Sequence, residues 1–333
     1  KMRTENISKV LYPADHVAEG KELRLRQEYF LSSATVQDIF YRFDKKHDDI
    51  SQLPDKVAIQ LNDTHPALAI PELLRILLDE KRLGWDAAWN IAINTFAYTN
   101  HTVMSEALEK WPVRIMEEIL PRHLQIIYHI NGLFMGQVAA GFPGDHDRLR
   151  RMSIIGEEGE KHVRMANLAI VGSHSVNGVS ALHSEILKDD LFHDFYELWP
   201  ERFNNKTNGI TQRRWLKYAN HRLSDLITSR IGDGWVTDLY QLKKLIPLAD
   251  DPEFQRQWIE VKRANKCVIA DYICRKNGVV VSPDSLFDCQ TKRIHEYKRQ
   301  LLNVLHVITR YNRLKINPGS SAAPRTVIFS GKA

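Results

Sequence analysis

The 333-residue sequence contains few cysteines and no long apolar run. Cys267, Cys274 and Cys289 are too few, and odd in number, for a disulfide framework or a four-ligand zinc site, so a reducing, cytoplasmic setting fits best. No apolar run approaches the roughly 18 residues needed to cross a bilayer, and the opening KMRTENISK lacks the apolar core of a signal peptide. A membrane location and the secretory route are therefore disfavoured.

The sequence also lacks a glycine-rich phosphate loop and a large charge excess. Neither Gly172 nor Gly178 is followed by Lys-Ser or Lys-Thr, and no G-x-G-x-x-G follows a predicted strand. The 46 Lys and Arg residues exceed the 41 Asp and Glu residues by five, which is mild beside the strongly basic faces of proteins that bind nucleic acid. We expect no nucleic-acid partner, and no metal site is predicted.

What remains is the composition of a globular protein of about two domains. Apolar residues make up 43% of the chain, and its length is about twice that of an ordinary domain. The sequence stops directly after a strand-like run that ends at Ser330, where a compact domain rarely ends. We therefore expect the chain to be a fragment of a longer protein.

Strand, polar turn and helix alternate along the first part of the chain. Alternating apolar residues predict a strand at 57–61, before a polar turn at 62–66 and a helix that begins near Pro71. Residues 85–98 carry a helical apolar pattern, and the apolar run 167–172 predicts another strand. Such alternation predicts an α/β fold.

A dense cluster of turn-forming residues at 204–209 predicts a domain boundary after Asn208. Beyond it, the apolar patterns predict a strand at 286–290, a helix at 298–314 and a strand at 326–330. Together these elements form one βαβ unit, which is normally right-handed and has parallel strands.

The densest chemical signal is the run TKRIHEYKR at 291–299, which places four Lys or Arg residues between a predicted strand and a predicted helix. Helix N-termini attract anions through free N–H groups and the helix dipole, and Lys and Arg add charge-assisted hydrogen bonds. Parallel α/β sheets also bind ligands outside the carboxyl ends of their strands. The run therefore suits phosphate, although spacing alone favours a simpler interpretation, the solvated face of a helix.

Two polar clusters at predicted element ends carry side chains suited to sugar hydroxyls. They are Asn-Asp-Thr-His at 62–65 and Asn-His at 100–101. The alternative is local capping of backbone groups, which is the commoner role of Asn, Asp and Thr after strands. The residues alone leave both interpretations open.

Several runs of sequence together resemble one known family. In chain order they are LYPAD, EGKELRLRQEYF, DKVAIQLNDTHPALAIPEL, AYTNHTV, LPRHLQIIYHIN, GSHSVNGV, NKTNGIT and FDCQTKRIHEYKRQLLNVLHVITRYN. These runs resemble the α-glucan phosphorylases, the family of glycogen, starch and maltodextrin phosphorylases. The match covers nearly the whole chain in family order, and the last run is too long for a chance match.

The resemblance implies a GT-B type fold, in which two Rossmann-like α/β domains, both incomplete here, face a cleft. Residues 1–208 would be the later part of the amino-terminal glucan domain, and residues 209–333 the start of the carboxy-terminal domain that binds pyridoxal 5'-phosphate. The implied reaction is retaining phosphorolysis: inorganic phosphate takes the terminal α-1,4-linked glucose of glycogen, starch or maltodextrin and yields glucose 1-phosphate. Family members are usually homodimers.

The resemblance also implies which residues surround the sugar. His101, as a catalytic residue, and Asn208 would hydrogen-bond the 6-hydroxyl side of the bound glucose, and Tyr297 would lie near its 2-hydroxyl. Four further polar residues would contribute to substrate binding. Asp63 and His65 would lie on the acceptor side of the cleft, Glu106 in a neighbouring polar pocket, and Asp15 in a gate segment.

On the phosphate side, the resemblance gives the basic run a role. Arg293 and Lys298 would hold the substrate phosphate as catalytic residues, and Lys292 would neutralise the phosphate of pyridoxal 5'-phosphate. Trp215, in the run RRWLK, would lie beside that cofactor. Two phosphates held close together repel each other unless fixed cations surround them, which these side chains would supply.

Two of the departures of this sequence from the family pattern bear on the predicted site. The family's cofactor-bearing lysine lies in a motif beyond Ala333, so we expect the chain alone to be inactive. The gate segment has the sequence DHVA at 15–18, where the family often has Asp-Asn followed by aromatic residues.

Two alternative functions stay open. One is a nucleotide-sugar glycosyltransferase of the same architecture, and the other is a glucan-binding fragment without catalysis.

Overall fold

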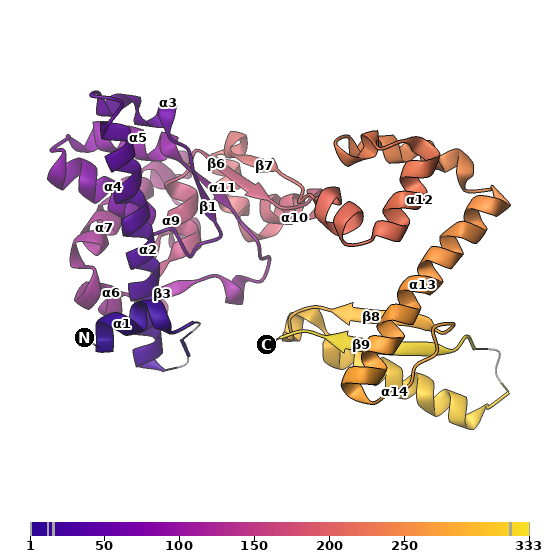
Figure 1. The fold of residues 1–333 in the computed structure, drawn as a ribbon. Helices are drawn as coiled ribbons and strands as arrows, with labels where there is room; N and C mark the ends of the chain where they lie inside the picture. Colours follow the sequence, from indigo (N-terminus) through magenta and orange to yellow (C-terminus); the bar gives the residue numbers. More distant parts are fainter. Residues whose placement is uncertain (1, 12, 15–16, 320–321, 333) are drawn as a thin grey trace. The chain divides into compact units, whose positions relative to one another are not determined.

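The computed structural model describes residues 2–11, 13–14, 17–319 and 322–332. The chain divides into two compact units, Lys1–Asn208 (unit 1) and Gly209–Ala333 (unit 2), and Figure 1 labels many of their helices and strands. Across the ranges just given, no helix combines the length and the apolar character that a membrane crossing requires.

Unit 1 is built from many short elements. Its α-helices are α1 (Met2–Lys9), α2 (Ala18–Asp44), α3 (Leu53–Lys56), α4 (Ala69–Arg75), α5 (Trp85–Thr95), α6 (Val113–Ile119), α7 (Pro121–Gly141), α8 (His146–Met152), α9 (Met165–Val171), α10 (Ala181–Ile186) and α11 (His193–Leu198). Its strands are β1 (Ile59–Asn62), β2 (Phe96–Thr99), β3 (Lys110–Pro112), β4 (Ile155–Gly156), β5 (His162–Arg164), β6 (Ser175–Gly178) and β7 (Phe203–Asn205). Turns of 3-10 or π helix are η1 (Ile50–Gln52), η2 (Ile76–Glu80), η3 (Ser105–Ala107), η4 (Leu187–Leu191) and η5 (Pro200–Arg202).

Four described strands of unit 1 form one parallel sheet in the order β1-β2-β6-β7. Leu61 on β1, Phe96 and Tyr98 on β2, and Val176 on β6 are fully buried, so aromatic and aliphatic side chains of the strands form part of the hydrophobic core. Because the strands are parallel, their carboxyl ends lie at one edge of the sheet. A smaller antiparallel sheet has the order β3-β5-β4.

The mixed α/β fold is confirmed, but the strand predicted at 167–172 is wrong. Residues 167–171 belong to the helix α9, which ends before Gly172, and the neighbouring strand is β6 at Ser175–Gly178. Every residue of α9 is buried, so the helix is apolar all round. A short apolar run of this kind has no periodicity that separates a buried helix from a buried strand.

The helix predicted at 85–98 is also wrong at its end. The helix α5 stops at Thr95, whose hydroxyl donates to the carbonyl of Ile91, and the chain continues as β2. Phe96 and Tyr98 both point into the core, as alternate residues of a strand do. In the sequence, their apolar character continues the helical pattern of α5, so the strand was predicted as part of the helix. The cluster at 204–209 likewise begins inside a strand, because β7 extends to Asn205.

Buried charge joins three helices of unit 1. Glu72 on α4 is fully buried and accepts hydrogen bonds from Ser33 on α2 at 2.7 Å and from Arg75 at 2.8 and 3.0 Å. The imidazole Nε2 of His123 on α7 lies 2.6 Å from the same carboxylate. Burial alone would raise the pKa of Glu72, but His123, Arg75 and Ser33 lower it to about 2.

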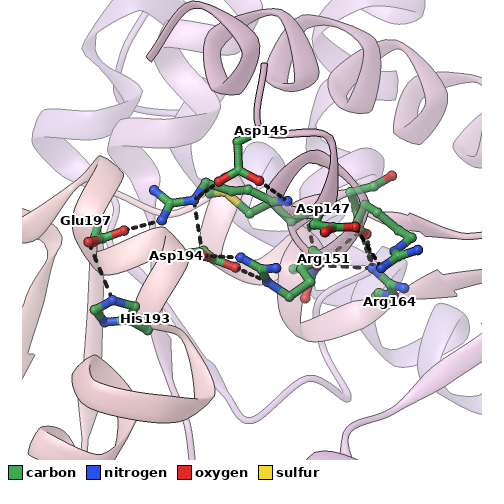
Figure 2. A network of polar contacts seen from close by, with 12 residues as sticks. Asp145, Asp147, Arg151, Arg164, His193, Asp194 and Glu197 are labelled. Atoms are coloured by element: carbon green, nitrogen blue, oxygen red, sulfur yellow. Dashed lines mark hydrogen bonds and ion pairs between the residues drawn. The ribbon is translucent and has the colours of Figure 1, made fainter. Parts of the chain in front are cut away.

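A second network of ion pairs joins α8 to α11, as Figure 2 shows. Arg151 donates to Asp194 at 2.7 and 2.9 Å, and Arg148 lies 3.2 Å from the same carboxylate and 2.5 Å from Glu197. Burial alone would raise the pKa of Asp194, but the hydrogen bond from Arg151 and the charges of Arg151 and Arg148 lower it overall. Ion pairs therefore hold the two helices together.

Unit 2 contains the helices α12 (His221–Ile231), α13 (Pro252–Asn277) and α14 (Gln300–Ile316), the strands β8 (Leu286–Thr291) and β9 (Arg325–Ser330), and the turns η6 (Arg213–Tyr218), η7 (Gly234–Val236), η8 (Leu239–Leu248) and η9 (Glu296–Lys298). The strands β8 and β9 pair in parallel from Leu286 opposite Arg325 to Thr291 opposite Ser330. The predicted strands, helix and parallel pairing of this unit are confirmed, with bounds shifted by one or two residues.

Candidate active site

Polar side chains gather at the carboxyl edge of the parallel sheet of unit 1. Asn62 ends β1, and His101 follows β2 by two residues. The His101 Nε2 lies 2.6 Å from the Asn62 Oδ1, and because a carbonyl oxygen accepts, Nε2–H donates. The other ring nitrogen of neutral His101 is then left to accept a hydrogen bond from a ligand hydroxyl.

The loop that carries His101 is fixed by buried Asn100. Its amide nitrogen donates to the Tyr98 hydroxyl at 3.1 Å, and its Oδ1 accepts from the backbone N–H of Thr102 at 3.0 Å. The same oxygen lies 3.0 Å from Nε2 of His183, whose Nδ1 accepts from the backbone N–H of Val179.

The tautomer of His183 follows from these contacts. Because Nδ1 accepts, the neutral ring carries its proton on Nε2 and donates to Asn100. Burial is the main cause that lowers the pKa of His183. A lowered pKa favours the neutral ring. The neutral Nε2–H tautomer of His183 therefore helps to hold the loop after β2 through Asn100.

Asp63 and Asn208 lie near strand ends of the same sheet. Asp63 follows β1 directly, has a left-handed backbone with φ of 66°, and accepts from the N–H of Thr64 at 2.7 Å. Asn208 follows β7 by three residues, has an exposed side chain, and donates its backbone N–H to the carbonyl of Val179 at 2.9 Å. Local hydrogen bonds thus set the backbone around both residues.

His65, predicted on the acceptor side, lies between two carboxylates. Its Nδ1 is 3.1 Å from Oε2 of Glu109 and 3.6 Å from Oε1 of Glu28. The hydrogen bond with Glu109 and the contact with Glu28 raise the pKa of His65 to about 10. Burial raises the pKa of Glu28 to about 7, and the charge of Glu109 adds to this shift while His65 and Arg24 oppose it.

In unit 2, the basic run forms a loop between β8 and α14 whose backbone is tied by side-chain amides. Gln290 donates to the carbonyl of Lys298 at 3.0 Å, and Gln300 donates to the carbonyl of Arg293 at 2.9 Å. Asn303 on α14 in turn donates to Gln290 at 2.9 Å. Two points of the loop are thereby fixed to the ends of the flanking strand and helix.

Glycine allows a close approach at the base of this loop. A Cβ added to Gly331, directly after β9, would lie 1.9 Å from the carbonyl oxygen of Lys292. The Lys292 N–H donates to the carbonyl of Ser330 at 3.0 Å, and that of Ile294 to the carbonyl of Lys332 at 2.9 Å. Only glycine fits at 331 without displacing the start of the basic loop.

Among the described residues, no carboxylate pairs with the three predicted phosphate-binding cations of the basic loop. Lys292, Arg293 and Lys298 form no ion pair with any carboxylate in the part of the chain that the structure describes. Lys292 and Arg293 are exposed, while the Lys298 ammonium lies 5.5 Å from the centre of the Tyr297 ring. Cations on a tied backbone, without a carboxylate partner among the described residues, suit an anionic ligand.

The predicted site residues are distributed over both units. Unit 1 has Asp63, His65, His101 and Asn208 on loops that follow strands of one sheet. Unit 2 has Lys292, Arg293, Tyr297 and Lys298 in one loop, and Trp215 is 65% exposed on η6. Asp15 lies outside the described residues, as does the side chain of Glu106. The roles of all these residues stay predictions.

Sequence reasoning missed Glu28, Glu109, Asn62 as a partner of His101, and His183 as a partner of Asn100. For Glu28 a signal exists, because it lies on α2 in register with buried residues such as Leu25 and Ser32. A charged residue on an otherwise buried helix face indicates a partner elsewhere in the fold. Glu109 carries no such local signal.

A family model described as carbohydrate phosphorylase matches residues 1–333. The chain belongs to the carbohydrate phosphorylase family. Among carbohydrate phosphorylases, it is 58% identical over 337 aligned residues to the muscle form of glycogen phosphorylase from Oryctolagus cuniculus, and likewise to that from Homo sapiens. The brain form from Bos taurus is 57% identical. Each alignment covers 99% of this chain and 40% of the relative, so the chain spans about two fifths of the length of these phosphorylases.

Proposed function

We propose that the whole protein is an α-glucan phosphorylase. It transfers the terminal α-1,4-linked glucose of glycogen, starch or maltodextrin to inorganic phosphate, with retained configuration, and releases glucose 1-phosphate. The proposal is carried by the loop at 292–298, whose cations Lys292, Arg293 and Lys298 pair with no carboxylate in the described ranges, in a chain matched along its whole length by the phosphorylase family. Phosphate is the substrate that such a loop suits.

In this proposal, unit 1 recognises the glucose and the remaining glucan. His101 and Asn208 hydrogen-bond the 6-hydroxyl side of the sugar, with Asn62 orienting the His101 ring through their 2.6 Å contact. Asp63 and His65 lie toward the acceptor glucan, with Glu106 and Asp15 as further substrate contacts. Asn62 acts through His101 and is a positioning residue.

Unit 2 binds the anions and begins the cofactor domain. Arg293 and Lys298 hold the attacking phosphate and stabilise charge in the transition state, and Tyr297 contacts the glucose near its 2-hydroxyl. The amides that tie the loop backbone favour a fixed arrangement of these cations before substrate binds.

Pyridoxal 5'-phosphate fits the residues of this loop as the cofactor. The exposed Lys292 ammonium, without a carboxylate partner among the described residues, would neutralise the cofactor phosphate, and exposed Trp215 would lie beside the ring. When bound, the cofactor supplies a phosphate that exchanges a proton with the substrate phosphate. A cytoplasmic location agrees with the three free cysteines. We also propose that the whole protein is a homodimer.

The test separates phosphorolysis from transfer through a nucleotide sugar. The full-length protein is incubated with maltoheptaose and phosphate, or with maltoheptaose and uridine or adenosine diphosphate glucose, and the glucan length is followed. We expect shortening with phosphate and no extension with either nucleotide sugar. Extension that requires a nucleotide sugar would support the glycosyltransferase alternative, and glucan binding without any change in length would support a binding role.

A further inference from the structure

Three side chains of metal-ligand type converge in unit 1 from separate elements. Glu28 lies on α2, His65 in the turn between β1 and α4, and Glu109 directly before β3. One ligand atom from each residue lies within 4.8 Å of the other two. The Nδ1 of His65 is 3.1 Å from a Glu109 oxygen and 3.6 Å from a Glu28 oxygen.

These separations match a tetrahedral ion. Imidazole nitrogen and carboxylate oxygen bind Zn²⁺ at about 2.0–2.1 Å, and two ligands of a tetrahedron at that radius are roughly 3.3 Å apart. The two distances from His65 bracket this value. An ion therefore fits between the three side chains with shifts of a few tenths of an ångström on the His65 side.

Glu28 supplies an independent observation. It is only 5% exposed, and neither of its carboxylate oxygens accepts a hydrogen bond from any described residue. Oε1 of Glu109 is buried without a hydrogen bond as well, within the same described set. Buried carboxylate oxygens are costly unless donors or cations satisfy them.

Arg24 is the cation already present beside Glu28. Its Nε lies 2.9 Å from Oε1 of Glu28, one turn along α2, and its side chain is 28% exposed. This contact serves one oxygen of one carboxylate. A dication between Glu28 and Glu109 would serve both carboxylates at once, which a single guanidinium on α2 does not do.

Solvent reaches the cluster through a cavity of about 450 Å³, whose lining includes Arg24, Glu28, His65 and Pro66. The His65 side chain is 55% exposed, so an ion from solution reaches its ring nitrogen without unfolding of α2. The cavity also has room for the water that would complete four ligands.

We propose that Glu28, His65 and Glu109 form a binding site for a divalent transition-metal ion such as Zn²⁺. The ion replaces the proton on Nδ1 of His65, which leaves to solvent, and water occupies the fourth position. One imidazole with two carboxylates at tetrahedral spacing favours Zn²⁺ over Mg²⁺, which prefers six oxygen ligands. This inference does not rest on the proposed glucan chemistry.

Isothermal titration of the purified chain with ZnCl₂, in a buffer that does not bind the metal, tests the proposal. We expect one Zn²⁺ to bind per chain. His65→Gln should weaken the Zn²⁺ affinity by about 100-fold, because loss of a ligand costs at least as much as loss of an outer-shell partner. Glu28→Gln weakens it as well. His193→Gln is the matched control, since His193 Nε2 lies 3.5 Å from Glu197 on the surface, and it leaves the affinity unchanged.

X-ray absorption at the zinc edge identifies the ligands. Nitrogen and oxygen at about 2.0–2.1 Å, with one imidazole, support the site, whereas a sulfur shell at about 2.3 Å would assign the ion to the free cysteines and overturn it. Equal affinity in His65→Gln and wild type also overturns it. His65 is exposed, so His65→Gln is expected to fold, and circular dichroism checks this.

Discussion

At the residue scale, Glu72 is a fully buried carboxylate of unit 1. Ser33, Arg75 and His123 surround its carboxylate, so the ionised form is satisfied inside the protein. With a pKa of about 2 in the folded state, below the 4.5 of an ordinary glutamate, Glu72 favours folding when it is ionised. Its contribution is full above pH 4.5 and declines as the pH falls toward 2.

We predict that Glu72→Gln destabilises unit 1 by about 3 kcal/mol at pH 6, because Arg75 loses a buried counter-charge and His123 loses its carboxylate partner. The difference from wild type should shrink between pH 5 and pH 3, as protons neutralise the wild-type carboxylate. Urea unfolding across this range measures it. Exposed Glu118→Gln is the control and should behave as wild type, and a Glu72→Gln difference independent of pH would contradict the account.

Arg293 is the residue on which the proposed chemistry depends most. We predict that Arg293→Ala in the full-length protein lowers kcat/KM for phosphorolysis by about 100-fold, or about 3 kcal/mol, as the loss of one preorganised charge contact does. Arg313→Ala, an exposed cation at the end of α14, should leave the rate unchanged. Steady-state kinetics with phosphate varied decides it, and equal rates for Arg293→Ala and wild type would refute the role.

At the element scale, α13 shows how its sequence sets its ends. The side chain of Asp251 accepts from the N–H groups of Glu253 and Phe254 at 2.9 and 3.4 Å, and Gly278 ends the helix with a left-handed φ of 68°. We predict that Asp251→Ala lowers the free energy of unfolding by about 1 kcal/mol. Thermal unfolding measures this loss. Asp250→Ala, at the neighbouring position, should leave the free energy of unfolding nearly unchanged, and equal losses of stability in the two variants would argue against the cap.

The junction of β9 with the basic loop leads to a second prediction at this scale. Gly331→Ala places a methyl group against the carbonyl of Lys292, so the loop must shift. Because a displacement near 1 Å can cost 100-fold in rate, we expect kcat/KM for phosphate to fall by about 10- to 100-fold in the full-length protein. Gly319→Ala, whose nearest contact is 4.0 Å away, serves as the control. Normal kinetics in Gly331→Ala would show that the loop geometry is not needed.

Sequence patterns predicted the elements of unit 2 better than those of unit 1. The strands at 286–290 and 326–330 are bounded by turns, so their type and ends follow from local residues. Residues 167–172 and 96–98 lie where a helix and a strand adjoin inside the core. There the choice is made by tertiary packing, which a local pattern does not contain.

The sequence predicted only part of the candidate site. Motifs led to Asp63, His65 and His101 on strand-end loops, because loop residues of α/β folds carry binding groups. Glu28 and Glu109 beside His65 were not predicted, since they come from a helix and a loop that meet only in the folded chain. Contacts between distant segments are the part of a site that spacing does not encode.

At the scale of the whole molecule, the two units carry complementary chemistry. Unit 1 offers amides, an imidazole and carboxylates at the edge of its parallel sheet, which suit hydroxyl groups. Unit 2 offers cations in a loop tied to its strand and helix, and these cations, which have no carboxylate partner in the part of the chain that the structure describes, suit phosphate. A phosphorylase needs both kinds of site, because its substrates are a neutral sugar chain and an anion.

Transfer of labelled inorganic phosphate into product shows whether the whole protein is a phosphorylase. The full-length protein is given maltoheptaose and ³²P-phosphate, and the products are separated and counted. We expect label to enter α-glucose 1-phosphate, one phosphate for each glucose removed from the glucan. If all label stayed in inorganic phosphate while the glucan was shortened or extended, the proposed phosphorolysis would be wrong.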